Sequence, residues 1–308
     1  MTPGATSRRR KRTRPRGSGR AWEGLIEAPG AAIYCKSLGQ GPPLLLLHGG
    51  PGADHTDFLP HLLPLAKRRR LILIDQRGSG RSERLADPSG YTLDGMIEDI
   101  EAVRKAFRLR KMDVLGHSFG GILAQAYAIR HPSAVRHLIL AGTAASARTI
   151  NADFRRMRAA TSAAVRAKLA TFEAKGIFGK NGSYVPGYAA LCSRVYAPYM
   201  YQRGVYPIKP SEYVTGWAVL REMWVRQSDF KVEGNLRGFD FTRQLRGMKV
   251  PTLVVVGDRD MVSLRSAKNL SASLHNGRLH VMSRCGHMMF VDDGPAFIAL
   301  AQAFLESR

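Results

Sequence analysis

The stretch of sequence that decides the fold is MDVLGHSFGGILAQAYAIR, residues 112–130. Residues 112–115 are apolar except for Asp113 and predict a buried strand, and from Gly121 onward apolar side chains recur at helical spacing. Between the two lies the pentapeptide at 116–120, with serine at its centre and glycine at both ends. A strand, a sharp turn of the form G-x-S-x-G and a helix together indicate a nucleophile elbow.

The elbow makes Ser118 the candidate nucleophile. The turn is so tight that side chains beside the serine would collide, which explains the glycines at both ends. The serine would lie at the N-terminus of the helix, where free N–H groups and the helix dipole favour a developing anion. The alternative is a glycine-rich turn whose serine only caps the helix.

A serine nucleophile needs a base within hydrogen-bond reach, and the base needs a carboxylate partner. In chains with this elbow the acid and then the histidine follow the serine in sequence. His287 lies in a loop past the last predicted strand and is our candidate base. Asp258 and Asp260 both follow the strand predicted at 252–256. We favour Asp260, because it clears the strand end, and keep Asp258 as the alternative.

An oxyanion hole would hold the negative charge of the tetrahedral intermediate. One N–H group should come from Phe119, the residue after the nucleophile. The other should come from HGGPG at 48–52, a glycine loop at the end of the first parallel strand. We choose Gly50, because a glycine lets the backbone approach the substrate, and a tight turn without this role is the alternative.

Strands and helices alternate over residues 21–145 and again over 244–308. This pattern predicts an α/β core with a mostly parallel central sheet and flanking helices. Residues 146–243 lack the alternation, and we expect an inserted helical cap there. Within it the sequence predicts helices over 153–175 and 211–226, with most aromatic side chains in the core of the cap.

The chain has 308 residues, 44% of them hydrophobic, and a formal net charge of +23. Residues 1–20 contain eight Lys or Arg and no acid, and so few apolar residues that we expect a disordered tail. Such a tail could attract nucleic acid or an anionic membrane. We prefer a solvated tail, because the interleaved aromatic residues of a specific nucleic-acid reader are missing.

No apolar h-region follows the arginines, which argues against a secretory or twin-arginine signal. No apolar run approaches the ~18 residues that a membrane span needs. The three cysteines, Cys35, Cys192 and Cys285, are far apart and indicate neither a disulfide framework nor a zinc site. A reducing, cytoplasmic compartment is therefore expected. Asp292 and Asp293, beyond His287, are interpreted as surface charges.

Several motifs together carry a resemblance to a known family. The chain resembles the α/β-hydrolases, and among them the proline iminopeptidases (prolyl aminopeptidases) and related amidases of the serine aminopeptidase group. The resemblance covers roughly residues 24–305 and implies an α/β-hydrolase fold with a cap. It also implies removal of an N-terminal residue, often proline, from short peptides or amides through an acyl-enzyme. Beside the elbow, its motifs are HGGPG at 48–52, DQRGSGRS at 75–82, KVPTL at 249–253 and CGH at 285–287.

The resemblance further implies carboxylates in or near the cap that hold the ammonium group of the substrate. Asp229 stands where the group usually has a glutamate, and Glu222 is a second candidate; exposed cap charges without this role are the alternative. The group often has another glutamate directly after the catalytic acid, whereas this chain has Met261. An esterase, lactonase or general amidase without a free-amine requirement is therefore the alternative function.

No motif indicates a metal or an organic cofactor, and we expect neither. The expected partner is a small peptide, amide or ester. An epoxide hydrolase or dehalogenase is disfavoured, because those enzymes carry a carboxylate at the elbow, where this chain has Ser118. A rival of another class is a non-catalytic binding protein that uses its basic surface.

Overall fold

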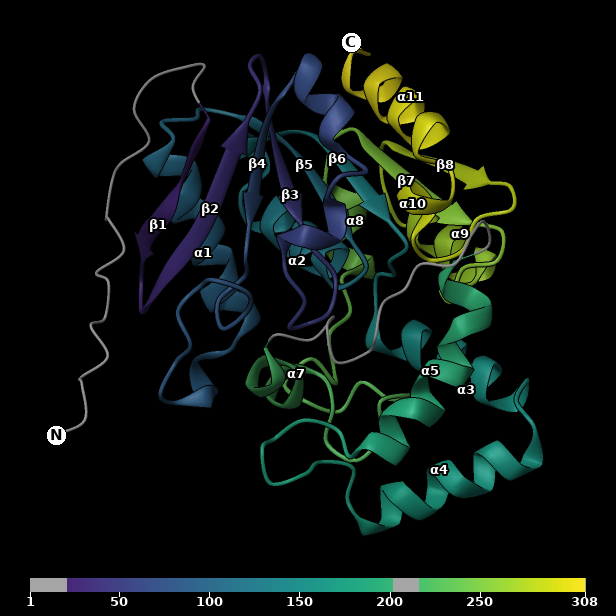
Figure 1. Cartoon of the computed structure of the whole chain (residues 1–308). Coiled ribbons are helices and arrows are strands. Elements are labelled where there is room, and N and C mark those ends of the chain that lie inside the picture. The colour runs from purple at the N-terminus through teal and green to yellow at the C-terminus, as the bar shows by residue number, and fades with distance from the viewer. Residues whose placement is uncertain (1–20, 202–215, 308) are drawn as a thin grey trace, which may run out of the picture.

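The computed structural model describes residues 21–201 and 216–307. A single eight-stranded sheet runs through the described chain in the order β1-β2-β4-β3-β5-β6-β7-β8 (Figure 1). The strands from β4 to β8 in this order are parallel, which confirms the predicted fold class. The strands are β1 (Trp22–Ala28), β2 (Ala31–Leu38), β3 (Pro43–Leu47), β4 (Arg70–Ile74), β5 (Met112–His117), β6 (Val135–Ala141), β7 (Thr252–Gly257) and β8 (Gly277–Met282).

The first two strands form the antiparallel edge of the sheet. β1 pairs with β2 along its whole length, and the turn between them contains Gly30 at a φ of 78°, a conformation that glycine adopts without strain. The two strands therefore form a hairpin around Pro29 and Gly30. β2 then pairs antiparallel with β4, so the parallel part of the sheet begins at β4.

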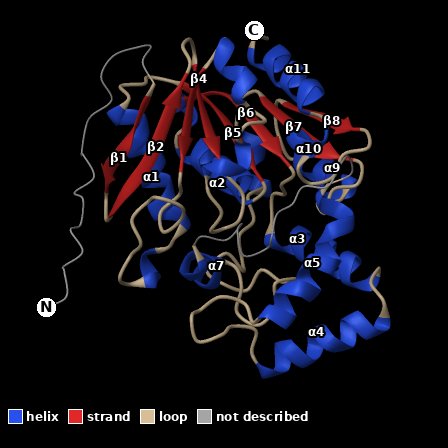
Figure 2. Ribbon diagram, in the orientation of Figure 1, coloured by secondary structure: helices blue, strands red, loops and turns tan. Residues whose placement is uncertain are grey.

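Helices cover both faces of the sheet (Figure 2). Successive residues of β3 show why its sequence is apolar throughout: Leu45 and Leu47 pack into one hydrophobic cluster, and Leu44 and Leu46 pack into the other. The core helices are α1 (Leu93–Ala106), α2 (Phe119–Arg130), α9 (Leu264–Ala272), α10 (Met289–Asp292) and α11 (Gly294–Leu305).

Local signals set the ends of several of these elements. The Thr92 hydroxyl accepts a hydrogen bond from the Gly95 N–H at 3.0 Å, so it caps α1. Two short 3-10 turns, His55–Phe58 and Leu63–Lys67, lie on either side of Pro60. Proline has no N–H to continue a helix, which explains the break.

The inserted region is helical, and Figure 1 shows it beyond the carboxyl ends of the parallel strands. The single helix expected over 153–175 was wrong. The chain breaks between α3 and α4, and Ser162 caps α4 by accepting from the Val165 N–H at 3.4 Å. Part of the helix expected over 211–226 lies outside the described residues. The helices are α3 (Ala147–Ala159), α4 (Ala163–Lys175), α5 (Pro186–Met200), α7 (Trp217–Met223) and α8 (Thr242–Gly247).

Aromatic side chains fill the interior of this region, as the sequence predicted for most of them. Phe154 of α3 lies edge-on to Trp224 and Phe230, with ring centroids 6.2 and 6.1 Å apart. All three side chains are buried. Edge-to-face packing of this kind stabilises a core beyond its buried area, and these rings belong to the hydrophobic cluster that continues under the sheet.

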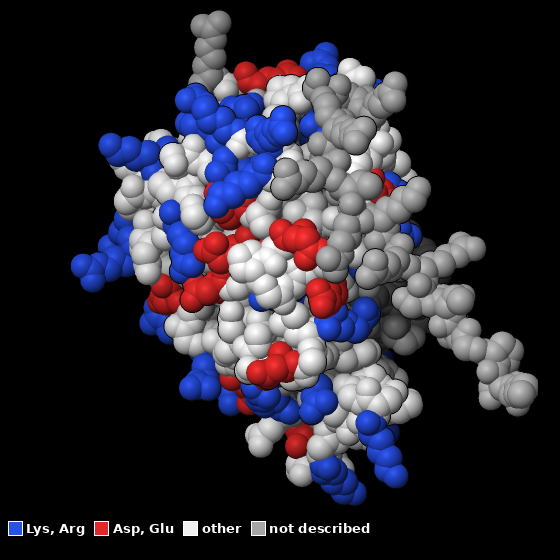
Figure 3. Space-filling model, turned by 90° about the vertical axis from the view of Figure 1, so that its left-hand side faces the viewer, with Lys and Arg blue, Asp and Glu red and all other residues white. Residues whose placement is uncertain are grey.

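The described surface is rich in positive charge. Figure 3 shows Lys and Arg most closely gathered at the end of the molecule opposite the cap. Arg108, Arg110 and Lys111, just before β5, are exposed at that end. The predicted basic tail, residues 1–20, lies outside the described residues. Within the described residues no helix is long and apolar enough to cross a membrane, and the three cysteines are buried and unbridged.

Candidate active site

Ser118 stands in a strained turn between β5 and α2. Its φ of 54° and ψ of −120° lie in a region that residues other than glycine rarely adopt. Its N–H donates to the carbonyl of Ala141, at the end of β6, at 2.9 Å, and its carbonyl accepts from the Gly121 N–H at 2.9 Å. These bonds hold the turn in place and leave the serine at the N-terminus of α2.

The flanking glycines are required by close backbone contacts. A Cβ on Gly116 would lie 2.3 Å from the carbonyl oxygen of Gly120, and a Cβ on Gly120 would lie 2.0 Å from that of Leu47 in β3. Real Cβ atoms do not approach so closely. The elbow therefore depends on both glycines, for the steric reason that the sequence suggested.

His287 and Asp260 form a buried pair. His287 Nδ1 lies 2.7 Å from Asp260 Oδ1, which also accepts from the Val262 N–H at 2.9 Å. Because a carboxylate accepts, Nδ1 carries the proton and Nε2 is left as the basic nitrogen. Asp258, the alternative acid, is exposed and instead accepts from the Cys285 N–H at 3.2 Å.

The end of β6 lies next to both Ser118 and this pair. A Cβ on Gly142, the residue after β6, would lie 3.0 Å from the ring of His287 and 3.1 Å from Asp260 Oδ2. The Ser118 N–H bonds to the carbonyl of Ala141, which directly precedes this glycine. The serine, the acid and the histidine thus follow three strands whose carboxyl ends lie at one edge of the sheet, where open α/β sheets place their sites.

His117, for which the sequence suggested no role, contacts His287 and supports its position. Its ring lies 4.7 Å from that of His287, and its Nε2 lies 3.0 Å from the His287 carbonyl oxygen. A carbonyl only accepts, so Nε2 carries the proton. Burial, followed by the neighbouring His287, holds the pKa of His117 well below its usual value. His117 is therefore a neutral donor beside the nucleophile.

The glycine loop at 48–52 lies against the elbow, since a Cβ on Gly49 would be 3.3 Å from the Ser118 Cβ. Gly50 has a φ of 114°, and a Cβ there would lie 2.5 Å from the Gly52 nitrogen, so only glycine fits. Phe119 is the first residue of α2, where an N–H has no carbonyl of its own helix to reach. The two residues predicted for the oxyanion hole therefore lie on segments that border Ser118.

The glycine loop is tied to the segment at 75–82. The Gln76 N–H donates to His48 Nε2 at 3.1 Å, and the Gln76 side chain donates to the His48 carbonyl at 2.8 Å. The ring nitrogen that accepts cannot carry the proton, so His48 Nδ1 donates to the Gly49 carbonyl at 2.8 Å. His48 is thus a structural residue of the loop, and both of its ring nitrogens are already hydrogen-bonded.

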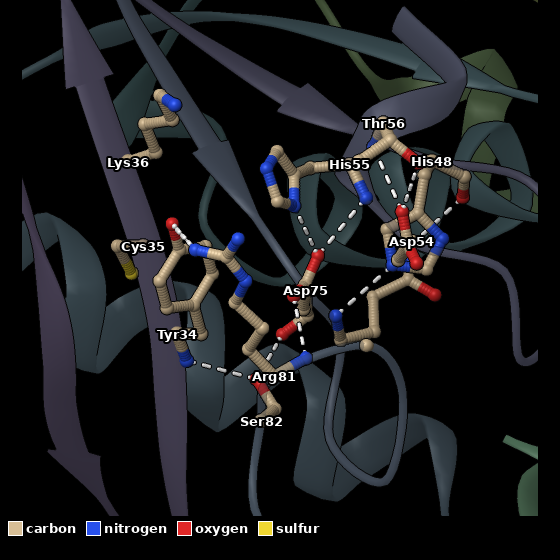
Figure 4. A network of polar contacts seen from close by, with 12 residues as sticks. Tyr34, Cys35, Lys36, His48, Asp54, His55, Thr56, Asp75, Arg81 and Ser82 are labelled. Atoms are coloured by element: carbon tan, nitrogen blue, oxygen red, sulfur yellow. Dashed lines mark hydrogen bonds and ion pairs between the residues drawn. The ribbon is translucent and has the colours of Figure 1, made fainter. Parts of the chain in front are cut away.

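Asp75, the first residue of this segment, is the centre of a network of hydrogen bonds (Figure 4). Its Oδ1 accepts from the backbone N–H and Nδ1 of His55, at 2.9 and 2.7 Å, and its Oδ2 accepts from the Arg81 N–H at 2.7 Å. Burial alone would raise the pKa of Asp75, but the hydrogen bond and charge of His55 bring it below its usual value. An ionised carboxylate here braces both loops beneath the site.

Asp54, His55 and Asp75 form the one group of three potential metal ligands among the described residues, with ligand atoms within 4.8 Å of one another. Both oxygens of Asp75 already accept N–H donors, and Asp54 Oδ1 accepts from the backbone and hydroxyl of Thr56. The group is accounted for by these hydrogen bonds. We therefore interpret it as a brace between loops.

Asp229 lies inside the cap among tyrosines, not on its surface. The Tyr184 hydroxyl donates to its Oδ1 at 2.7 Å, and its N–H donates to the Tyr188 hydroxyl at 2.8 Å. The Tyr196 hydroxyl donates to its carbonyl at 3.3 Å. Burial raises the pKa of Asp229, although the bond from Tyr184 opposes the rise. The surroundings suit a cation that would pair with this carboxylate.

The structure does not place Glu222 with Asp229 in one cluster. Glu222 Oε2 lies 3.2 Å from Nη2 of Arg226, four residues further along the chain. The carboxylate that does neighbour Asp229 is Glu173 of α4, which accepts from the Ser228 hydroxyl at 2.6 Å and pairs with Arg158 at 2.7 Å. No motif in the sequence marks Glu173. Only the packing of α4 against the other segments of the inserted region brings Glu173 close to Asp229.

The loop that carries His287 shows a further correction. Asp292, which we expected on the surface, is buried, and its Oδ2 accepts from the Gly286 N–H at 2.7 Å. It thereby fixes the backbone just before His287. Asp293 caps α11 by accepting from the Ala296 N–H at 3.2 Å. The sequence alone does not show that the side chain of Asp292 folds back to the backbone of Gly286.

Comparisons with known proteins agree with this geometry. The model of the alpha/beta hydrolase fold family matches residues 42–294. A proline iminopeptidase of Lactobacillus helveticus (strain DPC 4571) is 32% identical over 298 residues, covering 93% of this chain and 98% of the relative. One from Heyndrickxia coagulans is 30% identical over 293 residues, covering 92% and 99%.

A crystal structure of the proline iminopeptidase of Mycobacterium smegmatis has the same fold, with a TM-score of 0.79 at 24% identity. The match covers 92% of this chain and 97% of that one. The elbow, the strand order of the sheet and the matches over nearly the whole chain all indicate the same family. The chain therefore belongs to the α/β-hydrolase family and is a relative of the proline iminopeptidases.

Proposed function

We propose that this protein is a serine hydrolase in which Ser118 is the nucleophile, His287 the general base and Asp260 the acid that orients it. The observation that carries the proposal is the buried 2.7 Å contact between His287 and Asp260 beside a serine in a strained elbow. Gly50 and Phe119 would supply the N–H groups of the oxyanion hole.

The cycle follows from this arrangement. Ser118 attacks the acyl carbon while His287 Nε2 takes its proton, and Asp260 stabilises the imidazolium. The oxyanion is held by the N–H groups of Gly50 and Phe119. His287 then protonates the leaving group, which departs as an amine or alcohol. Water, deprotonated by His287, finally cleaves the acyl-enzyme and restores the serine.

The substrate we propose is a short peptide or amide with a free N-terminal amine, bound beneath a cap formed by residues 146–243. Two observations support this choice: the relatives are proline iminopeptidases, and Asp229 lies among tyrosines in the cap. A carboxylate in a partly dry site forms a strong, directional bond to an ammonium group. The neighbouring aromatic rings add attraction for a cation.

A second candidate is an esterase, lactonase or general amidase with no need for a free amine. It is favoured by Met261, which follows Asp260 where the group often has a glutamate, and which packs against the hydrophobic core. A site with one carboxylate in place of two would bind an ammonium group less strongly. Neutral acyl substrates would then compete more effectively.

The deciding experiment compares proline arylamide, its N-acetylated form and a short-chain p-nitrophenyl ester, with Ser118→Ala as the blank. Turnover of the free amine alone supports the aminopeptidase. Equal turnover of the acetylated amide and the ester supports the second candidate. Labelling by a fluorophosphonate that is lost in Ser118→Ala would support the hydrolase itself, and its absence in the wild type would refute it.

A further inference from the structure

Arg156 of the cap helix α3 touches the loop that carries the proposed acid and the end of helix α5, which in turn contacts the loop of the proposed base. Its Nη2 donates to the carbonyl of Met261 at 2.9 Å, and its guanidinium lies 5.3 Å from the centre of the Tyr199 ring. Its Nε lies 3.6 Å from Asp153, on the same helix. One side chain thus joins α3 to the loop after β7 and to the end of α5.

The contact at Met261 acts on the acid. Met261 directly follows Asp260, and the same loop is held a second time by α3. The buried carboxylate of Asp153 accepts from the Ser263 N–H at 3.1 Å and from the Ser266 hydroxyl at 2.6 Å. Asp153 and Arg156 therefore hold the backbone on the carboxyl side of Asp260.

The contact at Tyr199 acts on the base. The Tyr199 carbonyl accepts from the His287 N–H at 2.7 Å, and the next carbonyl, of Met200, accepts from the Met288 N–H at 3.0 Å. A Cβ on Gly286 would lie 2.6 Å from the Tyr199 oxygen, so the loop and the helix end are in direct contact. The carboxyl end of α5 therefore sets the position of the His287 backbone.

We infer that Arg156 is a positioning residue that holds His287 and Asp260 at the relative position that proton transfer needs. This inference rests on the proposed function. The two residues follow different strands, and proton transfer tolerates displacements of only about 0.5 Å. A planar guanidinium can donate to a carbonyl and stack on a ring at the same time, which the ammonium group of lysine cannot do. The cap helix thus contributes to the chemistry without touching the substrate.

The same helix α5 also reaches the proposed amine site. Tyr188 and Tyr196, both on α5, hydrogen-bond to the backbone of Asp229, while Tyr199 and Met200 at its end hold the loop of His287. Arg156 packs on that end of the helix. We therefore expect its removal to slow the chemical step more than it weakens substrate binding.

The test compares Arg156→Ala and Arg156→Lys with Arg155→Ala, which removes the same charge from the exposed neighbouring position on α3. For Arg156→Ala we expect kcat to fall about tenfold with KM changed less than twofold, a loss that corresponds to about 1.4 kcal/mol. The rate of fluorophosphonate labelling of Ser118 should fall in parallel. Arg156→Lys should recover only part of the loss, and Arg155→Ala should match the wild type.

The outcomes separate this inference from the proposed function. A wild-type protein that is neither labelled nor active refutes the hydrolase. A labelled wild type with equal rates in Arg156→Ala and Arg155→Ala overturns the positioning role. If Arg156→Ala fails to fold, Tyr199→Leu removes the stacking ring while keeping the backbone carbonyl. A kcat equal to that of the wild type in this variant would also overturn the inference.

Discussion

His117 donates a hydrogen bond from Nε2 to the backbone carbonyl of His287 across 3.0 Å, and the two rings lie 4.7 Å apart. The residue before the candidate nucleophile thereby supports the backbone of the candidate base. Because burial holds the pKa of His117 well below its usual value, it stays a neutral donor over the ordinary pH range. The contact links the elbow to the loop after β8 without adding a charge beside His287.

Replacing His117 by phenylalanine should keep the ring packing and remove the donor. A neutral hydrogen bond contributes about 1 kcal/mol, so we expect kcat to fall three- to tenfold with KM unchanged. Steady-state kinetics on the best substrate of the panel measures this. His280→Phe, at an exposed position of β8, is the control. Equal kcat values in the two variants would contradict the role of His117.

Replacing Asp229 by asparagine should weaken binding of a free amine. A hydrogen bond to a charged group contributes about 1.5 to 3 kcal/mol, so kcat/KM for proline arylamide should fall at least tenfold. Turnover of the p-nitrophenyl ester should be unaffected, because that substrate has no ammonium group. Glu222→Gln, which removes a carboxylate paired with Arg226, should leave both rates unchanged. A parallel loss on the ester would assign Asp229 to the structure of the cap.

Glu101 should stabilise the fold in a pH-dependent manner. Its carboxylate accepts from Arg104 at 2.8 and 2.7 Å and from Tyr127 at 3.1 Å, and the hydrogen bonds from Arg104 lower its pKa to about 2. The unfolded chain binds the proton near pH 4.3, so this stability is present above that pH and is lost as the pH falls toward 2.

Replacing Glu101 by glutamine should therefore lower Tm more at pH 7 than at pH 3. At pH 7 we expect a loss on the order of 1 to 2 kcal/mol, or a few degrees in Tm, measured by calorimetry. Glu98→Gln, at an exposed position of the same helix, provides the control. The same Tm shift at both pH values would show that the glutamine acts through packing and not through charge.

A methyl group at Gly120 should disrupt the elbow. The new Cβ would lie 2.0 Å from the backbone oxygen of Leu47, which cannot move without shifting β3. Overpacking of this kind costs about 1 to 3 kcal/mol or more, so Gly120→Ala should lower Tm by several degrees. Gly247→Ala is the matched control, because nothing lies within 4 Å of its Cβ. Equal Tm values in the two variants would contradict the steric reading of the motif.

The sequence predicted most of the core because its signals are local. The apolar run at 44–47 and the mostly apolar stretch at 112–115 are buried on two faces, so their composition indicates parallel strands. Thr92, which directly precedes an amphipathic segment, caps α1 through its own hydroxyl. The helix expected over 153–175 was wrong, because Ser162 can cap a new helix in the middle of a segment that is otherwise rich in helix formers.

The sequence by itself determined the elbow, the sheet class and the short set of residues that could act with Ser118. These follow from steric rules within a few residues, such as the glycines at 116 and 120. Only the tertiary structure decided which aspartate meets His287, that Asp229 lies among tyrosines, that Asp292 is buried, and that Arg156 joins the loop after β7 to the end of α5. Those contacts join residues distant in sequence, and packing of the cap on the sheet creates them.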